Sequence, residues 1–211
     1  MNITFVGAGQ VGGALAARLA EAGHHVVLAE NKEGSATLSA ALARSNRLSS
    51  LPMEEAVRAA ELVFLATPFS AATSVVGPLA DALAGKILVD CTNPVGPGLT
   101  HGLKSERSGS EALQALAPKA SVVKAFTIYG FENLENPTFP AYNVKPAMFY
   151  CGDDGAAKQR VAQLITDCGF EPLDVGGLVQ ALHLEHMTLL WVRMVRLNGH
   201  SPQLTWAALR R

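Results

Sequence analysis

Three glycines near the N-terminus, Gly7, Gly9 and Gly12, have the spacing of a loop that binds a diphosphate. The first permits a tight turn, the second lets backbone approach the diphosphate, and the third lets a helix lie close to its strand. The start of that helix, with Gln10 and Val11, would offer unpaired N–H groups and a partial positive charge. The segment therefore indicates binding of a dinucleotide.

An acidic residue, Glu30, follows the apolar residues 26–29 that come after this helix. A carboxylate at this place can accept hydrogen bonds from the ribose of the adenosine, and its charge would repel a 2′-phosphate, which favours NAD. The next residues, Asn31 and Lys32, could instead hold that phosphate, with Glu30 turned aside. NAD and NADP therefore remain alternatives.

Three later apolar segments read as buried strands, at residues 62–66, 86–90 and 121–126. Ligands bind at the carboxyl ends of parallel strands, so the turns after these segments should line one crevice with the glycine loop. Thr67 and Pro68 could brace the ribose or adenine side, because proline holds backbone rigid. Asn93, before Pro94, has amide groups that suit a ribose or a carboxamide, with an ordinary turn as the alternative.

The elements that would position these residues alternate between strand-like and helix-like along most of the chain. Continuous apolar strands separated by helices are typical of a parallel sheet covered on both faces. We therefore expect an α/β fold, a Rossmann-type doubly wound and mostly parallel sheet over residues 1–175. A short C-terminal helical segment, 176–211, should pack on the sheet or at a dimer interface. Its helix, about 177–197, aligns one stripe at steps of three and four, namely Leu182, His186, Leu190, Met194 and Leu197.

Composition limits the partners and the compartment. The chain has 211 residues and a net charge of −1, with acids and bases interspersed, so neither nucleic acid nor an anionic membrane surface is expected. No apolar run approaches the ~20 residues of a membrane span. The first strand begins too early for a signal peptide, and the three cysteines are far apart, which predicts a reduced, cytoplasmic protein.

Other reactive side chains have plainer interpretations. His183 and His186 are three residues apart and have no evident further ligands, which favours core or interface histidines over a metal site. Cys91 is expected to be a small packing residue. No Ser-His-Asp set or carboxylate pair emerges, so we expect neither a catalytic side chain nor a metal. Hydride transfer between two bound rings needs positioning and exclusion of water rather than a protein acid or base.

Several blocks, spread over nearly the whole chain, recur together in one known family. The blocks lie at residues 7–16, 23–24, 90–94, 122–126, 149–154 and 184–191. By these blocks the chain resembles the NADPH-dependent coenzyme F420 reductases, also called deazaflavin-dependent NADP oxidoreductases. That family is shared with the cytoplasmic domain of STEAP-type metalloreductases. Asp-Cys-Thr-Asn-Pro at 90–94 and Val-Lys-Ala-Phe at 123–126 are much more specific than the glycine loop.

The resemblance implies a dimeric Rossmann protein with NADPH along the glycine loop and a deazaflavin or flavin stacked on the nicotinamide. Carried over by position, Ala125, Phe126 and Thr127 would line the nicotinamide and acceptor pocket. The main hypothesis is an NAD(P)-dependent oxidoreductase that passes a hydride to such a planar acceptor. The alternative is a nucleotide-binding redox sensor or partner protein without turnover.

Overall fold

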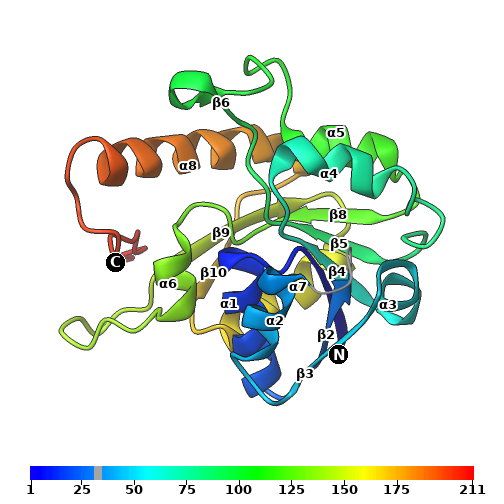
Figure 1. Cartoon of the computed structure of the whole chain (residues 1–211). Helices are drawn as coiled ribbons and strands as arrows, with labels where there is room; N and C mark the ends of the chain where they lie inside the picture. Colours follow the sequence, from blue (N-terminus) through cyan, green and yellow to red (C-terminus); the bar gives the residue numbers. More distant parts are fainter. Residues whose placement is uncertain (31–34) are drawn as a thin grey trace.

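The structure, a computed structural model, describes residues 1–30 and 35–211 and is built around an eight-stranded sheet (Figure 1). The strands are β1 (Asn2–Val6), β2 (His25–Glu30), β3 (Leu48–Pro52), β4 (Leu62–Leu65), β5 (Ile87–Asp90), β8 (Ser121–Lys124), β9 (Ala147–Gly152) and β10 (Glu171–Asp174). Their order across the sheet is β10-β9-β8-β5-β4-β1-β2-β3. Neighbouring strands run parallel except β8 and β9, which are antiparallel. The predicted doubly wound, mostly parallel α/β fold is confirmed.

Helices cover both faces of this sheet. They are α1 (Gln10–Glu21), α2 (Ala36–Leu42), α3 (Met53–Ala59), α4 (Phe69–Val76), α5 (Gly109–Leu116), α6 (Phe131–Glu135), α7 (Gly155–Asp167) and α8 (Ala181–Arg196). A short hairpin of β6 (Val95–Gly96) and β7 (Thr100–His101) projects beyond α8 and α5 (Figure 1). A single 3₁₀ turn (Leu178–Gln180) leads into α8.

Alternate residues of each central strand enter two separate hydrophobic cores. In β4, Leu62 and Phe64 pack into the core that contains α1, α7 and α8, whereas Val63 and Leu65 pack into the core that contains α3, α4 and α5. The phenyl rings of Phe5 and Phe64 stack with centroids 4.4 Å apart. Because both faces are buried, the strand has to be apolar at every position, which is why it was recognisable in the sequence.

The order of the strands changes direction at β1. From β1 the chain proceeds to β2 and β3 on one side, and then crosses to β4 on the other side of β1. The carboxyl ends of β1 and β4 therefore lie at the point where the winding direction reverses. In open α/β sheets this is where ligands bind.

The C-terminal helix is confirmed, but the face that it packs against the protein differs from the stripe seen in the sequence. Leu184 is 2% exposed and Trp191 is also buried, whereas Leu190 of that stripe is 52% exposed. His183 and His186 are exposed as well, which rules out the core alternative, whereas their location at an interface stays a prediction. The hydrophobic periodicity indicated the wrong face of the helix because the buried face also holds polar residues. Hydropathy assigns such residues to the surface, but these have hydrogen-bond partners inside the protein.

The chain after α8 is irregular but is held against the sheet. The backbone N–H of Ala147 at the start of β9 donates to the carbonyl of Trp206 at 2.8 Å. The indole N–H of Trp191 donates to the carbonyl of Leu204 at the same distance. Within residues 1–30 and 35–211, no helix has both the length and the apolar character needed to cross a bilayer.

Two leucines on α8 provide a matched test of which face packs inward. We expect Leu184→Ala to lower the free energy of unfolding by about 2–5 kcal/mol, because it leaves a cavity in the core. Leu190→Ala, at an exposed position, should cost less than about 0.5 kcal/mol. Urea unfolding followed by circular dichroism measures both. Equal losses for the two variants would show that the orientation of α8 is wrong.

Candidate functional site

The turns that follow the central parallel strands lie at one edge of the sheet. They are residues 7–9 after β1, 66–68 after β4, 91–94 after β5 and 125–127 after β8. Glu30 ends the adjacent strand β2 at the same edge. The fold thus brings together the predicted site residues that the structure describes. Asn31 and Lys32 lie outside the described residues.

The three glycines of the first turn have different surroundings. Gly7 has φ +105°, and a Cβ atom there would lie 2.6 Å from the backbone carbonyl of Ala66. A Cβ at Gly12 would collide with the carbonyl oxygen of Gly7. At Gly9, by contrast, a Cβ would meet nothing within 4 Å. Gly7 and Gly12 are therefore required by the fold, whereas Gly9 leaves space on the open side of the turn.

The N-terminus of α1 faces this turn. Gly9 is the N-cap of the 12-residue helix and has no side chain to satisfy the first N–H groups. Its first turn carries no acidic residue that would compete for them. Unpaired N–H groups at a helix N-terminus attract anions, and the effect is strongest within the first turn. The turn and the helix thus fit the diphosphate of a dinucleotide.

Three polar atoms at the strand ends are buried without a hydrogen-bond partner among the described residues. They are Thr67 Oγ1, Asn93 Oδ1 and Thr127 Oγ1. An unsatisfied buried polar group costs about 1–3 kcal/mol, so it is rarely retained without a reason. All three were predicted to contact a cofactor. Hydrogen-bonding groups of a ribose or a carboxamide are the chemistry that would satisfy them.

The turn after β8 has a strained backbone conformation and is held in place by contacts from two other elements. The Asn93 side-chain amide donates to the Thr127 carbonyl at 3.4 Å, and the Thr188 hydroxyl of α8 donates to the same carbonyl at 2.9 Å. Phe126 has φ +58°, which is uncommon for a bulky residue, and its ring packs in the core 5.6 Å from that of Phe64. Ala125 and Phe126 are fully buried and therefore offer backbone rather than side chains to a ligand.

Glu30 is fixed by a residue that the sequence analysis did not consider. The hydroxyl of Ser50 on β3 donates to one carboxylate oxygen of Glu30 at 2.6 Å. Parallel pairing of β2 with β3 places the two side chains together at the edge of the sheet. The acid is thus oriented at the strand end where ribose hydroxyls would bind.

A buried cluster of charged groups lies beneath the turns after β5 and β8, and sequence reasoning missed it. The Lys124 ammonium Nζ is 3.0 Å from Asp90 Oδ2 and 3.1 Å from Glu185 Oε1. The other oxygen of Glu185 is 2.7 Å from His101 Nε2. The cluster joins β5, β8, the β6–β7 hairpin and α8. The available signal was the pair of opposite charges, Asp90 and Lys124, that end two apolar strands.

Burial and charge act in opposite directions on these groups. Burial alone lowers the pKa of Lys124, but the neighbouring Asp90 and Glu185 raise it above its ordinary value, so the ammonium stays charged. Burial raises the pKa of the Cys91 thiol, and Asp90 adds to that effect. Cys91 therefore remains protonated and serves as a packing residue. In the part of the chain that the structure describes, no three His, Cys, Asp or Glu side chains converge on a possible metal position.

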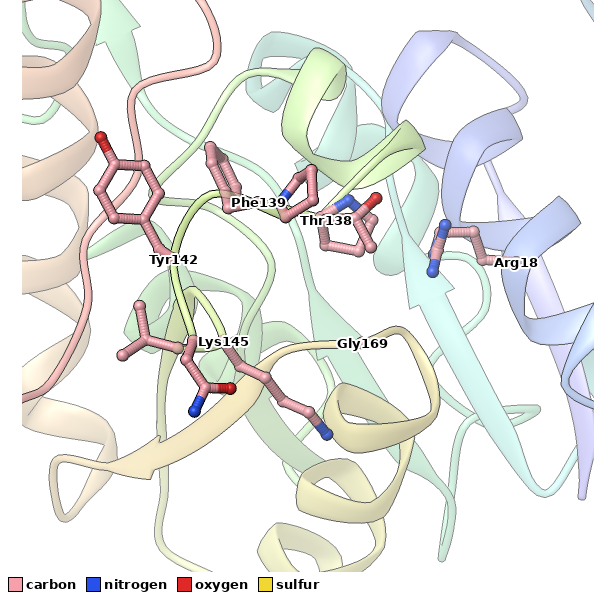
Figure 2. A pocket seen from close by; sticks show the side chains of 10 residues that line it. Arg18, Thr138, Phe139, Tyr142, Lys145 and Gly169 are labelled. Atoms are coloured by element: carbon pink, nitrogen blue, oxygen red, sulfur yellow. The ribbon is translucent and has the colours of Figure 1, made fainter.

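A separate hollow of about 520 Å³ lies between α1 and the loop before β9 (Figure 2). Phe139 and Tyr142 lie on one side of it and Arg18 on the other. The Arg18 guanidinium is already used, since it donates to the backbone carbonyls of Cys168 and Glu135 at 3.1 and 3.0 Å. The lining includes none of the described site residues, and the hollow is not part of the candidate site.

Comparison with known proteins agrees with this geometry. Residues 2–94 match the family model described as NADP oxidoreductase, coenzyme F420-dependent. The metalloreductase STEAP3 of Rattus norvegicus is 35% identical over 189 residues, which are 89% of this chain and 36% of that protein. This chain therefore spans about a third of the length of the curated metalloreductases that it matches.

Solved structures extend the likeness over nearly the whole chain. A protein of Arthrobacter sp. FB24, named as an F420-dependent NADP reductase, superposes with a TM-score of 0.84 and 28% identity over 94% of this chain and 95% of its own. The hypothetical protein SMa0349 of Sinorhizobium meliloti gives a TM-score of 0.74 and 26% identity, over 98% of this chain and 94% of its own.

The fold, the glycine loop and these matches define the class, a Rossmann-fold domain similar to NAD(P)-dependent oxidoreductases. Within that class, the resemblance to the coenzyme F420-dependent NADP oxidoreductase family, predicted from the sequence blocks, is confirmed.

Two glycines at helix starts provide a test of the diphosphate position. Gly9→Val should leave the fold intact, because a Cβ there meets no protein atom within 4 Å, but should fill the space of a diphosphate. We expect the Kd for NADPH to rise at least ~tenfold, or about 1.4 kcal/mol. Gly155→Val, at the equally open start of α7, should bind as the unaltered protein does. Calorimetry measures both, and tight binding by the Gly9 variant would contradict the assignment.

Proposed function

We propose that this chain binds NADP(H) or NAD(H) across the carboxyl edge of its sheet and transfers a hydride between the nicotinamide and a planar acceptor, such as a deazaflavin or a flavin. The observation that carries the proposal is the convergence of an open glycine turn with three unpartnered buried polar atoms, on Thr67, Asn93 and Thr127. The names of the family model and of the Arthrobacter structure support the same chemistry.

Different residues of the candidate site would bind the two halves of the cofactor. The turn from Gly7 to Gly12 and the first N–H groups of α1, including those of Gln10 and Val11, would hold the diphosphate. Glu30 would accept hydrogen bonds from the adenosine ribose, beside Asn31 and Lys32. Thr67, next to Pro68, would contact a ribose.

The nicotinamide half would lie over the turns after β5 and β8. Asn93, held rigid by the following Pro94, and Thr127 would orient the carboxamide with their unpartnered oxygens. Ala125 and Phe126 would support the ring through buried backbone. The nicotinamide supplies or takes up the hydride, and the protein contributes orientation and exclusion of water. No side chain is assigned as a catalytic acid or base.

The acceptor and the assembly are further parts of the proposal. The acceptor would stack on the exposed face of the nicotinamide, beside α8. We also propose a homodimer, as the family resemblance implies, and a location in the cytoplasm, which the three widely spaced cysteines favour. The exposed apolar residue Leu197, which follows the last residue of α8, gives such a dimer a candidate contact.

An acceptor screen tests the proposed activity. Oxidation of NADPH and of NADH is followed at 340 nm with coenzyme F420, FMN and quinones, with Gly9→Val as the matched control. We expect turnover with a planar acceptor, and a large loss of it in the control. Tight nucleotide binding without turnover on any acceptor would contradict the enzyme. It would favour the alternative, a redox sensor, whose binding to a partner should change with the nucleotide.

Glu30 decides the choice between the two cofactors. Glu30→Ser removes a charge that would repel a 2′-phosphate, so affinity for NADPH relative to NADH should rise by ~1–2 kcal/mol, or roughly five- to thirtyfold. Ser50→Ala keeps the charge and removes only the hydrogen bond that orients it, so its effect on this ratio should be smaller. Calorimetric Kd values for both nucleotides give the ratio. An unchanged ratio in the Glu30 variant would show that its carboxylate faces elsewhere.

A further inference from the structure

The buried cluster beneath the nicotinamide turns has a definite charge, which its hydrogen bonds reveal. Asp90 Oδ1 accepts the backbone N–H of Thr92 at 2.8 Å and its hydroxyl at 2.6 Å. Asp90 Oδ2 accepts from Lys124 Nζ at 3.0 Å and from the Ser110 hydroxyl at 2.5 Å. Ammonium and backbone N–H groups can only donate, so each oxygen faces a donor that requires an acceptor. Asp90 is therefore ionised.

The same reasoning applies to Glu185 and fixes the state of His101. The ring atom His101 Nδ1 accepts the backbone N–H groups of Leu103 and Ser105 at 3.3 and 3.0 Å, so it carries no proton. The imidazole is then neutral and donates from Nε2 to Glu185. Glu185 also accepts the Gly109 N–H at 2.9 Å and faces the Lys124 ammonium. Every contact of its two oxygens is a donor, and Glu185 is ionised.

The charges of the cluster do not cancel. Two carboxylates, Asp90 and Glu185, face one ammonium, Lys124, and a neutral imidazole, His101. The sum is one negative charge on side chains that solvent does not reach. A charge in this position is weakly screened, because neither water nor salt surrounds it.

This charge lies directly against the turns of the proposed nicotinamide site. Lys124 Nζ donates to the carbonyl of Thr92, the residue before Asn93, at 2.8 Å. Thr188, one turn of α8 beyond Glu185, donates to the carbonyl of Thr127. The negative field extends to the turn after β5: besides burial, Asp90 raises the pKa of the Cys91 thiol, and Lys124 offsets only part of the rise.

We propose that the cluster of Asp90, Lys124, Glu185 and His101 stabilises the positive charge of the oxidised nicotinamide ring and so biases the bound cofactor towards hydride donation. This inference rests on the proposed function. A hydride, one proton with two electrons, passes from the dihydronicotinamide to the planar acceptor. The acceptor is reduced, and the oxidised ring carries one positive charge more than before. A fixed negative charge beneath that ring favours the oxidised form over the reduced one.

The test compares affinities rather than activity. The Kd values for NADP⁺ and NADPH are measured by calorimetry for the unaltered protein and for Glu185→Gln, Asp90→Asn and Ser110→Ala. The first two variants remove the net negative charge with little change of shape. Ser110→Ala removes a hydrogen bond of the same cluster without changing its charge. We expect the ratio of Kd for NADP⁺ to Kd for NADPH to rise about three- to tenfold in both charge variants, and to stay within about twofold for Ser110→Ala.

Each other outcome counts against the inference. Circular dichroism selects the folded variants, and either charge variant is sufficient for the comparison. A constant ratio in a folded charge variant that still binds both nucleotides would overturn the electrostatic role and leave the proposed function standing. An equal shift in Ser110→Ala would assign the effect to packing and would also overturn it. Failure of the unaltered protein to bind either nucleotide would overturn the proposed function, and the inference with it.

Discussion

Lys124 cannot be buried alone, and this constraint organises the half of the molecule around β5 and β8. An unpaired ammonium in a protein interior costs many kcal/mol, so carboxylates have to reach it. Asp90 comes from the neighbouring strand, whereas Glu185 comes from α8 and brings His101 of the β6–β7 hairpin with it. The C-terminal helix and the hairpin are thus tied to the sheet by an electrostatic requirement as well as by apolar packing.

Polar side-chain oxygens have hydrogen-bond partners in the interior but lack them at the edge of the sheet. Inside the cluster, both oxygens of Asp90 and of Glu185 accept hydrogen bonds from donors. A few residues away, the side-chain oxygens Asn93 Oδ1 and Thr127 Oγ1 have no partner among the described residues. In a preorganised binding site, a network with all its hydrogen bonds made is expected to support nearby groups whose hydrogen bonds are left for the ligand. The positive φ of Phe126, held by its ring in the core, belongs to the same rigid support.

Much of the fold could be predicted because its signals are local. The buried strand β4 is apolar throughout, and Gly7 and Gly12 mark a turn whose backbone contacts exclude any side chain. The packing of α8 could not be predicted in the same way. A hydrophobic stripe that includes Leu190 suggested one face, yet the protein buries the face with Glu185, because that carboxylate has partners far away in the sequence. The periodicity of a helix sequence shows which residues are apolar, but it does not show which charged residues form ion pairs in the fold.

The sequence by itself determined the class of protein, because a turn that binds a dinucleotide is a property of the backbone. It needs only glycines at the right spacing and an acid at the end of the second strand. The blocks at 90–94 and 123–126 added the resemblance to one family. Only the tertiary structure decided that Asp90, Lys124, Glu185 and His101 share one buried charge beneath the site. The reason is physical: ion pairing depends on distance in space, and up to 95 positions of the chain, from Asp90 to Glu185, separate these groups.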